Sequence, residues 1–210
     1  VAAAAPAALG VHAFVAAACL LRQLRVRTPL PSILNLAKPT ADLLTHNKTL
    51  TATNARTDLL NEQLRELMQA FGLMKYLEAG ELLVRFVPKG GPWEINTRCA
   101  AIYAGGYILE NAPESDVRKE AERALITRLN DVQGPNPEDD RVRRMCAVAL
   151  GRMKSQSALS YLRQYYGQGQ TNRIVGYACA WAIRRITGEE IPDPPSLVEP
   201  QRGWFLEPLE

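Results

Sequence analysis

The fold is determined by residues 142–153, which read VRRMCAVALGRM. Two related stretches are INTRCAAIYAGGYI at 95–108 and VGYACAWAIRRI at 175–186. When their cysteines are aligned, each stretch has an apolar residue four positions before the cysteine, an alanine directly after it and a larger side chain four positions after it. These positions share one helix face, and the small central residues allow a neighbouring helix to approach closely. The cysteines are 47 and 33 residues apart, a spacing typical of stacked helical repeats.

Partner helices are predicted between and before these stretches. Apolar residues recur at helical spacing in 116–130 and in 155–166. Upstream, the same spacing predicts two further helices, 57–71 and 73–87, separated at Gly72. Their weaker pattern suits the terminal pair of a repeat array.

Capping residues and breakers mark the helix boundaries. The predicted N-caps are Ser115 or Asp116, Asp139 or Asp140, and Thr171 or Asn172, since each of these side chains can accept a hydrogen bond from the first helical turn. The GPNP run at 134–137 predicts a loop, and Gly188 predicts the end of the last helix.

The stretch VRRMCAVALGRM resembles the first helix of HEAT-like repeats, including the variant of phycobilisome-lyase-type proteins. That helix has the form Val-Arg-x-x-Ala-Ala-x-Ala-Leu-Gly, in which 146–147 take the Ala-Ala place and 150–151 match Leu-Gly. The run AIRRITG at 182–188 is similar to a common ending of such arrays. The resemblance implies an all-α fold, a short α-solenoid of about three and a half helix pairs over 54–188, and it says almost nothing about activity.

The first 21 residues carry no formal charge, and Arg22, Arg25 and Arg27 follow them closely. About twenty uncharged residues can cross a hydrocarbon core of ~30 Å, and the arginines would then lie on the cytoplasmic side. We therefore predict a hydrophobic anchor helix over 1–27. Two alternatives stay open, namely an alanine-rich helix packed inside an assembly and a secretory signal.

The segments on either side of the repeats are predicted to be extended. Residues 28–53 hold three prolines and a run rich in Thr and Asn, which is typical of a connector. Residues 189–210 are acidic and hold five prolines, which exclude a helix. Trp204 and Phe205 lie near the end of this tail, and we expect them to dock into a groove of this chain or of a neighbour.

The sequence lacks the motifs of common catalytic and metal sites. It has neither a CxxC pair nor the Cys–His spacing of a zinc site, and no phosphate-binding or nucleophile-elbow motif. His12 and His46 are not followed by glutamate, so the iron site of deoxyhypusine hydroxylase, a relative of HEAT-like proteins, is not expected. Cys99, Cys146 and Cys179 are predicted to be small buried residues that are too far apart for disulfides. We expect no catalysis, no cofactor and no metal.

Charge is distributed unevenly along the chain. Residues 94–140 have a net charge of −5, residues 141–188 carry nine basic side chains and no acidic ones, and residues 189–210 have a net charge of −5. The basic stretch is either neutralised within the chain, or it binds an acidic protein, lipid headgroups or nucleic acid. The candidate interaction residues are Arg143, Arg144, Arg152, Arg184, Arg185, Trp204 and Phe205.

The favoured hypothesis is a non-catalytic scaffold or assembly subunit, tethered to a membrane, that binds other protein subunits through its helical-repeat surface. Its repeat domain would lie on the cytoplasmic side. The alternative is a soluble binder of nucleic acid or another anionic ligand that uses 141–188. A third hypothesis, by resemblance alone, is a lyase-like HEAT protein, for which the sequence offers no catalytic residues.

Overall fold

The computed structural model describes residues 55–91, 93–167 and 173–194, together with seven residues between 31 and 42. All regular structure within this part of the chain is helical. The α-helices are α3 (Ala55–Leu73), α4 (Gly80–Val84), α5 (Ile95–Leu109), α6 (Asp116–Leu129), α7 (Asp140–Arg152), α8 (Leu159–Gly167) and α9 (Arg173–Thr187). Short 3₁₀ helices, η1 (Leu77–Ala79) and η2 (Gln156–Ala158), precede α4 and α8.

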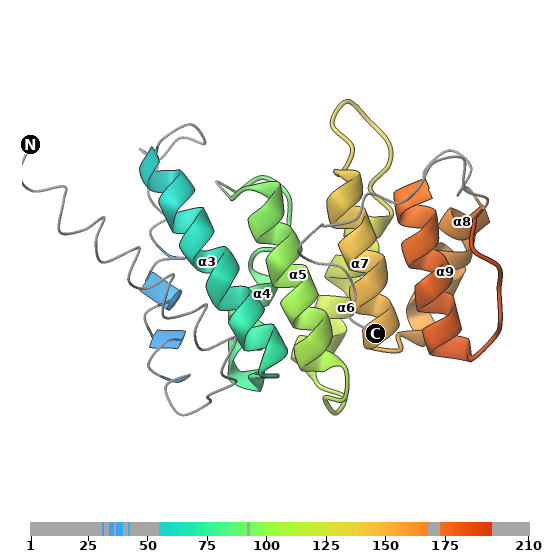
Figure 1. Cartoon of the computed structure of the whole chain (residues 1–210), viewed down its shortest axis with the longest axis horizontal. Coiled ribbons are helices and arrows are strands. Elements are labelled where there is room, and N and C mark those ends of the chain that lie inside the picture. Colours follow the sequence, from blue (N-terminus) through green and yellow to red (C-terminus); the bar gives the residue numbers. More distant parts are fainter. Residues whose placement is uncertain are drawn as a thin grey trace, which may run out of the picture.

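The helices form two layers (Figure 1). Helices α3, α5, α7 and α9 lie side by side in a front layer, and α4, α6 and α8 lie behind them. Each front helix contacts the next front helix, and the rear helices pack against α5, α7 and α9. The predicted all-α class and the packing of helices in pairs are therefore confirmed.

At each contact between neighbouring front helices, a glycine of one helix packs against an alanine of the next. The pairs are Gly72 with Ala104, Gly106 with Ala149, and Gly151 with Ala182. A Cβ atom built on these glycines would lie 2.6, 2.9 and 2.7 Å from the facing alanine Cα atoms. Such distances are shorter than real carbon contacts, so the two backbones touch and the glycines are required for the spacing of the layer.

These contacts correct the alignment of the three cysteines. They place the three alanines at equivalent positions, and Cys99 lies five residues before its alanine, whereas Cys146 and Cys179 lie three residues before theirs. The alignment is therefore wrong by two residues for the first stretch. Cysteine and alanine are both small and often buried, so either can occupy neighbouring positions of a tightly packed helix.

In the corrected alignment, Arg98 of α5 is equivalent to Arg143 of α7, and both arginines are buried. Each donates to a carbonyl near the end of the preceding rear helix, Arg98 to Val87 (2.8 Å) and Arg143 to Leu129 (3.0 Å). Arg98 also makes two hydrogen bonds with the carboxylate of Glu138. Burial raises the pKa of that carboxyl, but the hydrogen bonds and charge of Arg98 outweigh it, so the pKa is lowered overall. These arginines therefore tie α5 and α7 to the rear helix that precedes each of them.

The predicted break at Gly72 is wrong, because this residue lies inside α3 and allows the close contact with α5. The chain turns three residues later, at Lys75, where φ is 50°, and it makes the same turn after α7 at Lys154, where φ is 52°. In both turns the lysine N–H donates to the carbonyl three residues back, and the next N–H donates to the carbonyl five residues back, as in the Schellman motif. The predicted helix 73–87 is replaced by this turn, η1 and α4.

The predicted helix boundaries elsewhere agree with the structure. The side chains of Ser115 and Asp139 accept hydrogen bonds from the backbone N–H groups of Arg118 and Arg141, so the N-caps are these two residues, and Asp116 and Asp140 are the first residues of α6 and α7. The third predicted pair, Thr171 and Asn172, lies outside the described residues. Gly188 follows the end of α9 with a φ of 77°, a conformation that favours glycine.

The extended linker predicted for 28–53 is wrong for the described residues within it. Those between 31 and 42 are helical, and Leu34 and Ala37 are buried in the core. Asp42 pairs with Arg85, which follows α4, at 2.7 Å. The three-residue spacing of Leu34 and Ala37 puts both on one helix face. Burial of this apolar pair favours a helix here, although the prolines had indicated a connector.

The predicted anchor helix, 1–27, lies outside the described residues, and so does the tail beyond residue 194. Within the part that the structure describes, no helix is both long enough and apolar enough to cross a membrane.

Adjacent glycines of α5 allow a matched test of the glycine–alanine contacts. Gly105 lines a small apolar pocket of about 20 Å³ between α4, α5 and α6, and a Cβ atom there would meet nothing within 4 Å. We expect Gly105→Ala to raise the free energy of unfolding by about 0.5–1 kcal/mol, since alanine is the better helix former. Gly106→Ala should lower it by about 1–3 kcal/mol through overpacking against Ala149. Urea denaturation of both variants measures the difference, and equal effects would contradict the contact.

Candidate interaction surface

The three described cysteines do not form a reactive site. Cys99, Cys146 and Cys179 are free thiols, and all three are buried. Burial raises the pKa of the Cys99 and Cys179 thiols to about 12, and it also raises the pKa of Cys146. The prediction of small buried cysteines without disulfides is therefore confirmed for these residues.

Charged and aromatic side chains gather instead where the front helices end. The turn after α3, the C-terminal ends of α5 and α7 and the last turn of α9 all lie at one edge of the front layer (Figure 1). We call this group the Glu110 edge, and its members are Lys75, Tyr107, Glu110, Arg152, Trp181 and Arg185.

Glu110 is the hub of this edge. Its carboxylate binds Lys75 Nζ at 2.7 Å and accepts a hydrogen bond from Arg185, and Arg152 Nη1 lies 3.7 Å away. The side chains of Glu110 and Arg152 are 11% and 5% exposed, whereas those of Lys75 and Arg185 are 45% and 39% exposed. One mostly buried carboxylate therefore joins four front helices, two of them through cations that also face solvent.

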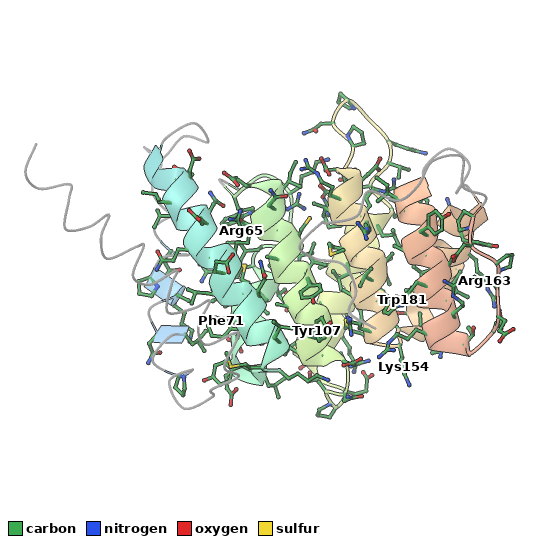
Figure 2. All side chains as sticks on the ribbon, in the orientation of Figure 1. Arg65, Phe71, Tyr107, Lys154, Arg163 and Trp181 are labelled. Carbon is green, nitrogen blue, oxygen red and sulfur yellow. The ribbon has the colours of Figure 1, made fainter. Side chains whose placement is uncertain are left out.

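Aromatic rings and arginines alternate along the same edge. The Arg152 guanidinium lies 3.6 Å from the centre of the Tyr107 ring and 5.7 Å from that of Trp181, and Arg185 lies 5.5 Å from the Trp181 ring. Arg152 also donates to the Tyr107 hydroxyl at 2.7 Å. Both aromatic side chains are half-buried, and Figure 2 shows them on the same side of the front layer. Such cation–π contacts hold the side chains in fixed positions.

Among the described residues, this edge holds more cations than carboxylates. Three cations surround the single carboxylate of Glu110, and Lys154 lies at the same edge (Figure 2). The side chain of Lys154 is exposed and has no carboxylate partner among the described residues. Burial raises the pKa of Glu110, but hydrogen bonds from Lys75 and Arg185 outweigh it, so the pKa is lowered and the carboxylate stays charged.

The candidate arginines predicted from the sequence separate into distinct groups. Arg152 and Arg185 meet at the Glu110 edge. Arg143 is buried between α6 and α7, Arg184 binds Asp193, and Arg144 is half-buried on α7. Trp204 and Phe205 lie outside the described residues.

Most of the basic stretch 141–188 is paired within the chain. Six of its nine cations contact carboxylates that come from the acidic segments before and after it. The pairs are Arg141–Asp139, Arg143–Asp140, Arg152–Glu110, Arg163–Glu189, Arg184–Asp193 and Arg185–Glu110. The positive charge available to a ligand is therefore concentrated at few positions rather than spread along the stretch.

Several members of the Glu110 edge were not identified from the sequence. Lys75, Tyr107, Glu110 and Trp181 come from three segments that are far apart in the chain, and none belongs to a chemical motif. One signal was present, because FGLMKY at 71–76 matches LGRMKS at 150–155 and places lysine at the same position of two turns.

This geometry defines an all-helical protein in which charged and aromatic side chains from several helices gather at one edge of the front layer. No group of three or more His, Cys, Asp or Glu side chains within the described residues could hold a metal ion. No protein-family model, curated protein or solved structure matches the chain.

Glu110→Gln tests the hub, because glutamine resembles the protonated acid. At pH 7 we expect this variant to lose about 1–3 kcal/mol of unfolding free energy, since it removes a charged acceptor from three cations. The folded pKa of Glu110 is lowered from 4.5, so the contribution of Glu110 is present above that pH and is lost as the pH falls through the folded value. The difference between the two proteins should therefore be full at pH 7 and should shrink as the pH falls below 4.5 towards the lowered pKa of the folded state, as measured by urea denaturation.

The matched control is Glu189→Gln, which affects the exposed pair with Arg163. Both side chains of this pair are more than half exposed, at 52% and 55%, so we expect a loss below about 1 kcal/mol at every pH. If the two variants behaved alike, Glu110 would not be a hub.

Proposed function

We propose that this chain is a HEAT-like α-solenoid that serves as a non-catalytic scaffold or assembly subunit, tethered to a membrane, and that it binds other protein subunits through its front layer. The Glu110 edge is the observation that carries the proposal. It presents Tyr, Trp and Arg side chains, the residue types that contribute most to protein–protein binding energy.

The arrangement of these side chains supports a docking role. Arg152 is held between Tyr107 and Trp181, so little side-chain entropy remains to be lost when a partner binds. The rings belong to α5 and α9, so a partner that covers both would span the front layer across α7. Many modest contacts along such a layer are the usual basis of binding by helical-repeat proteins.

Membrane tethering is supported by the sequence of the first 27 residues. A run of 21 residues without formal charge is followed by three arginines within six positions. This order favours insertion with the helical domain on the cytoplasmic side. Six cations in 141–188 pair with carboxylates of the same chain. This internal pairing argues against the alternative of a nucleic-acid binder, which needs cations that are free to contact phosphates.

Affinity purification from the source cells tests the scaffold role. We expect defined protein subunits to co-purify with the chain and to be reduced about tenfold or more by Trp181→Ala, because a central aromatic anchor is worth roughly 2 kcal/mol. Arg185→Glu, at a partly exposed position, should have a similar effect with less disturbance of the core.

Tyr161→Ala is the matched control, because this half-buried aromatic residue belongs to α8 in the rear layer. Its co-purifying subunits should remain at the level of the unmodified chain. Subunits that are retained by folded Trp181→Ala and Arg185→Glu variants would overturn the proposed surface.

Fractionation tests the membrane tether. The unmodified chain should sediment with membranes and resist an alkaline carbonate wash, because a spanning helix is not held by charge. A variant that lacks residues 1–21 should become soluble while retaining its partner subunits. A full chain that carbonate releases would contradict the anchor.

A further inference from the structure

Two cations are held together at the Glu110 edge by a single carboxylate. Lys75 Nζ binds Oε2 of Glu110 at 2.7 Å, and Nη2 of Arg185 donates to Oε1 of the same group. Positive charges from the turn after α3 and from the last turn of α9 therefore approach each other across the width of one carboxylate group. Two like charges share one opposite charge at this point of the surface.

Both cations keep hydrogen-bond donors that Glu110 does not use. An ammonium group has three N–H donors and a guanidinium has five, and each of these side chains gives one hydrogen bond to Glu110. The side chains of Lys75 and Arg185 are 45% and 39% exposed, whereas that of Glu110 is 11% exposed. A second carboxylate that approaches from solvent therefore meets the two cations before it meets Glu110.

Lys154 extends the positive charge along the same edge. It lies in the turn after α7, which repeats the turn that carries Lys75, and its side chain is exposed (Figure 2). The partial negative charge at the C-terminal end of a helix acts only within the last turn. The longer lysine and arginine side chains reach beyond it, so they determine the charge that a partner meets.

Apolar surface lies beside these cations. Tyr107 and Trp181 are half-buried, and Arg185 lies 5.5 Å from the centre of the Trp181 ring. Leu77, two residues after Lys75, is 52% exposed. Aromatic residues and arginine are enriched in protein interfaces, so this combination favours a ligand that offers both carboxylates and apolar side chains.

We infer that the Glu110 edge binds an acidic segment of a partner protein, in which carboxylates are interspersed with large apolar side chains. One carboxylate of the partner lies between Lys75 and Arg185, a second lies at Lys154, and an apolar side chain packs on the Trp181 ring. The inference rests on the proposed function, because it names the chemistry of the partner that docks at this surface.

An extended peptide segment matches the size and charge of the edge. Four front helices packed ~8–10 Å apart span roughly 24–30 Å, which an extended chain covers in about eight or nine residues. A nucleic-acid strand carries a negative charge at every nucleotide, and the three solvent-facing cations Lys75, Lys154 and Arg185 are too few to match it. A protein segment can place carboxylates at these cations and apolar side chains between them.

Fluorescence anisotropy tests the inference on the full chain in neutral detergent. The probe is a labelled peptide of about ten residues in which glutamate is interspersed with phenylalanine. One control peptide has glutamine in place of each glutamate, and a second has serine in place of each phenylalanine. We expect the probe to bind and each control to bind at least about tenfold more weakly, since one lacks charge-assisted hydrogen bonds and the other lacks ring packing.

Matched charge reversals locate the binding site. Lys154→Glu should weaken binding of the probe about fivefold, since it reverses one exposed charge at the edge. Lys119→Glu makes the same change at an exposed position of α6 in the rear layer and should leave the affinity unchanged. Carbodiimide cross-linking should join the probe to Lys75 or Lys154 and not to Lys119, as identified by mass spectrometry of the digested protein.

Four outcomes would overturn the inference. They are a probe that does not bind, a glutamine control that binds equally well, full affinity in Lys154→Glu, and displacement of the probe by oligothymidylate or by phosphatidylserine in the micelles at a lower concentration than unlabelled probe requires. The last outcome would assign the edge to nucleic acid or to lipid headgroups.

The proposed function is tested separately, because it depends on the loss of partner subunits in Trp181→Ala. If subunits are lost in that variant while the probe fails to bind, the docking surface stands and the acidic segment is excluded. If the probe binds at the edge and no subunit depends on Trp181, the proposed function fails although the edge recognises acidic peptides.

Discussion

Close approach of the front helices is the constraint on which the rest of the structure depends. At Gly72, Gly106 and Gly151 the backbone of one helix touches an alanine of the next, and a side chain of any size would force the helices apart. The rear helices α4 and α6 cannot compensate for such a shift, because buried arginines tie the chain at their ends to the front layer. A sequence can change most of its surface and keep this arrangement, but the glycine–alanine contacts leave little freedom.

The same constraint produces the Glu110 edge. Side chains from four front helices can meet around one carboxylate only because the helices are closely spaced and end at the same level. The turns that follow α3 and α7 have identical hydrogen-bond patterns and place a lysine in a left-handed conformation. That conformation costs a non-glycine residue about 1 kcal/mol or more. For Lys75, the ion pair with Glu110 offsets part of this cost. Lys154 is exposed and has no carboxylate partner among the described residues, so it can bind another anion.

Much of the fold could be predicted from the sequence, because periodicity and capping are local properties. The helices at 116–130 and 155–166 and the caps at Ser115 and Asp139 needed no knowledge of distant contacts. Gly72 was misinterpreted because a glycine that ends a helix and one that permits close packing look alike in a sequence. The Glu110 edge could not be predicted, since Lys75 and Arg185 lie 110 positions apart and meet only through the register of the stacked helices.

The charge distribution is a second feature that the sequence alone does not predict correctly. Counted along the chain, 141–188 is strongly basic and suggests an anionic ligand. In three dimensions the acidic segments on both sides lie against it, so carboxylates such as Asp140, Glu110 and Asp193 neutralise most of its arginines. Few cations remain partly exposed, and they lie next to aromatic rings that are held in fixed positions. Under the proposed function, such a surface would select partners by ring packing and local charge, whereas a surface built for nucleic acid would keep its cations unpaired on one face.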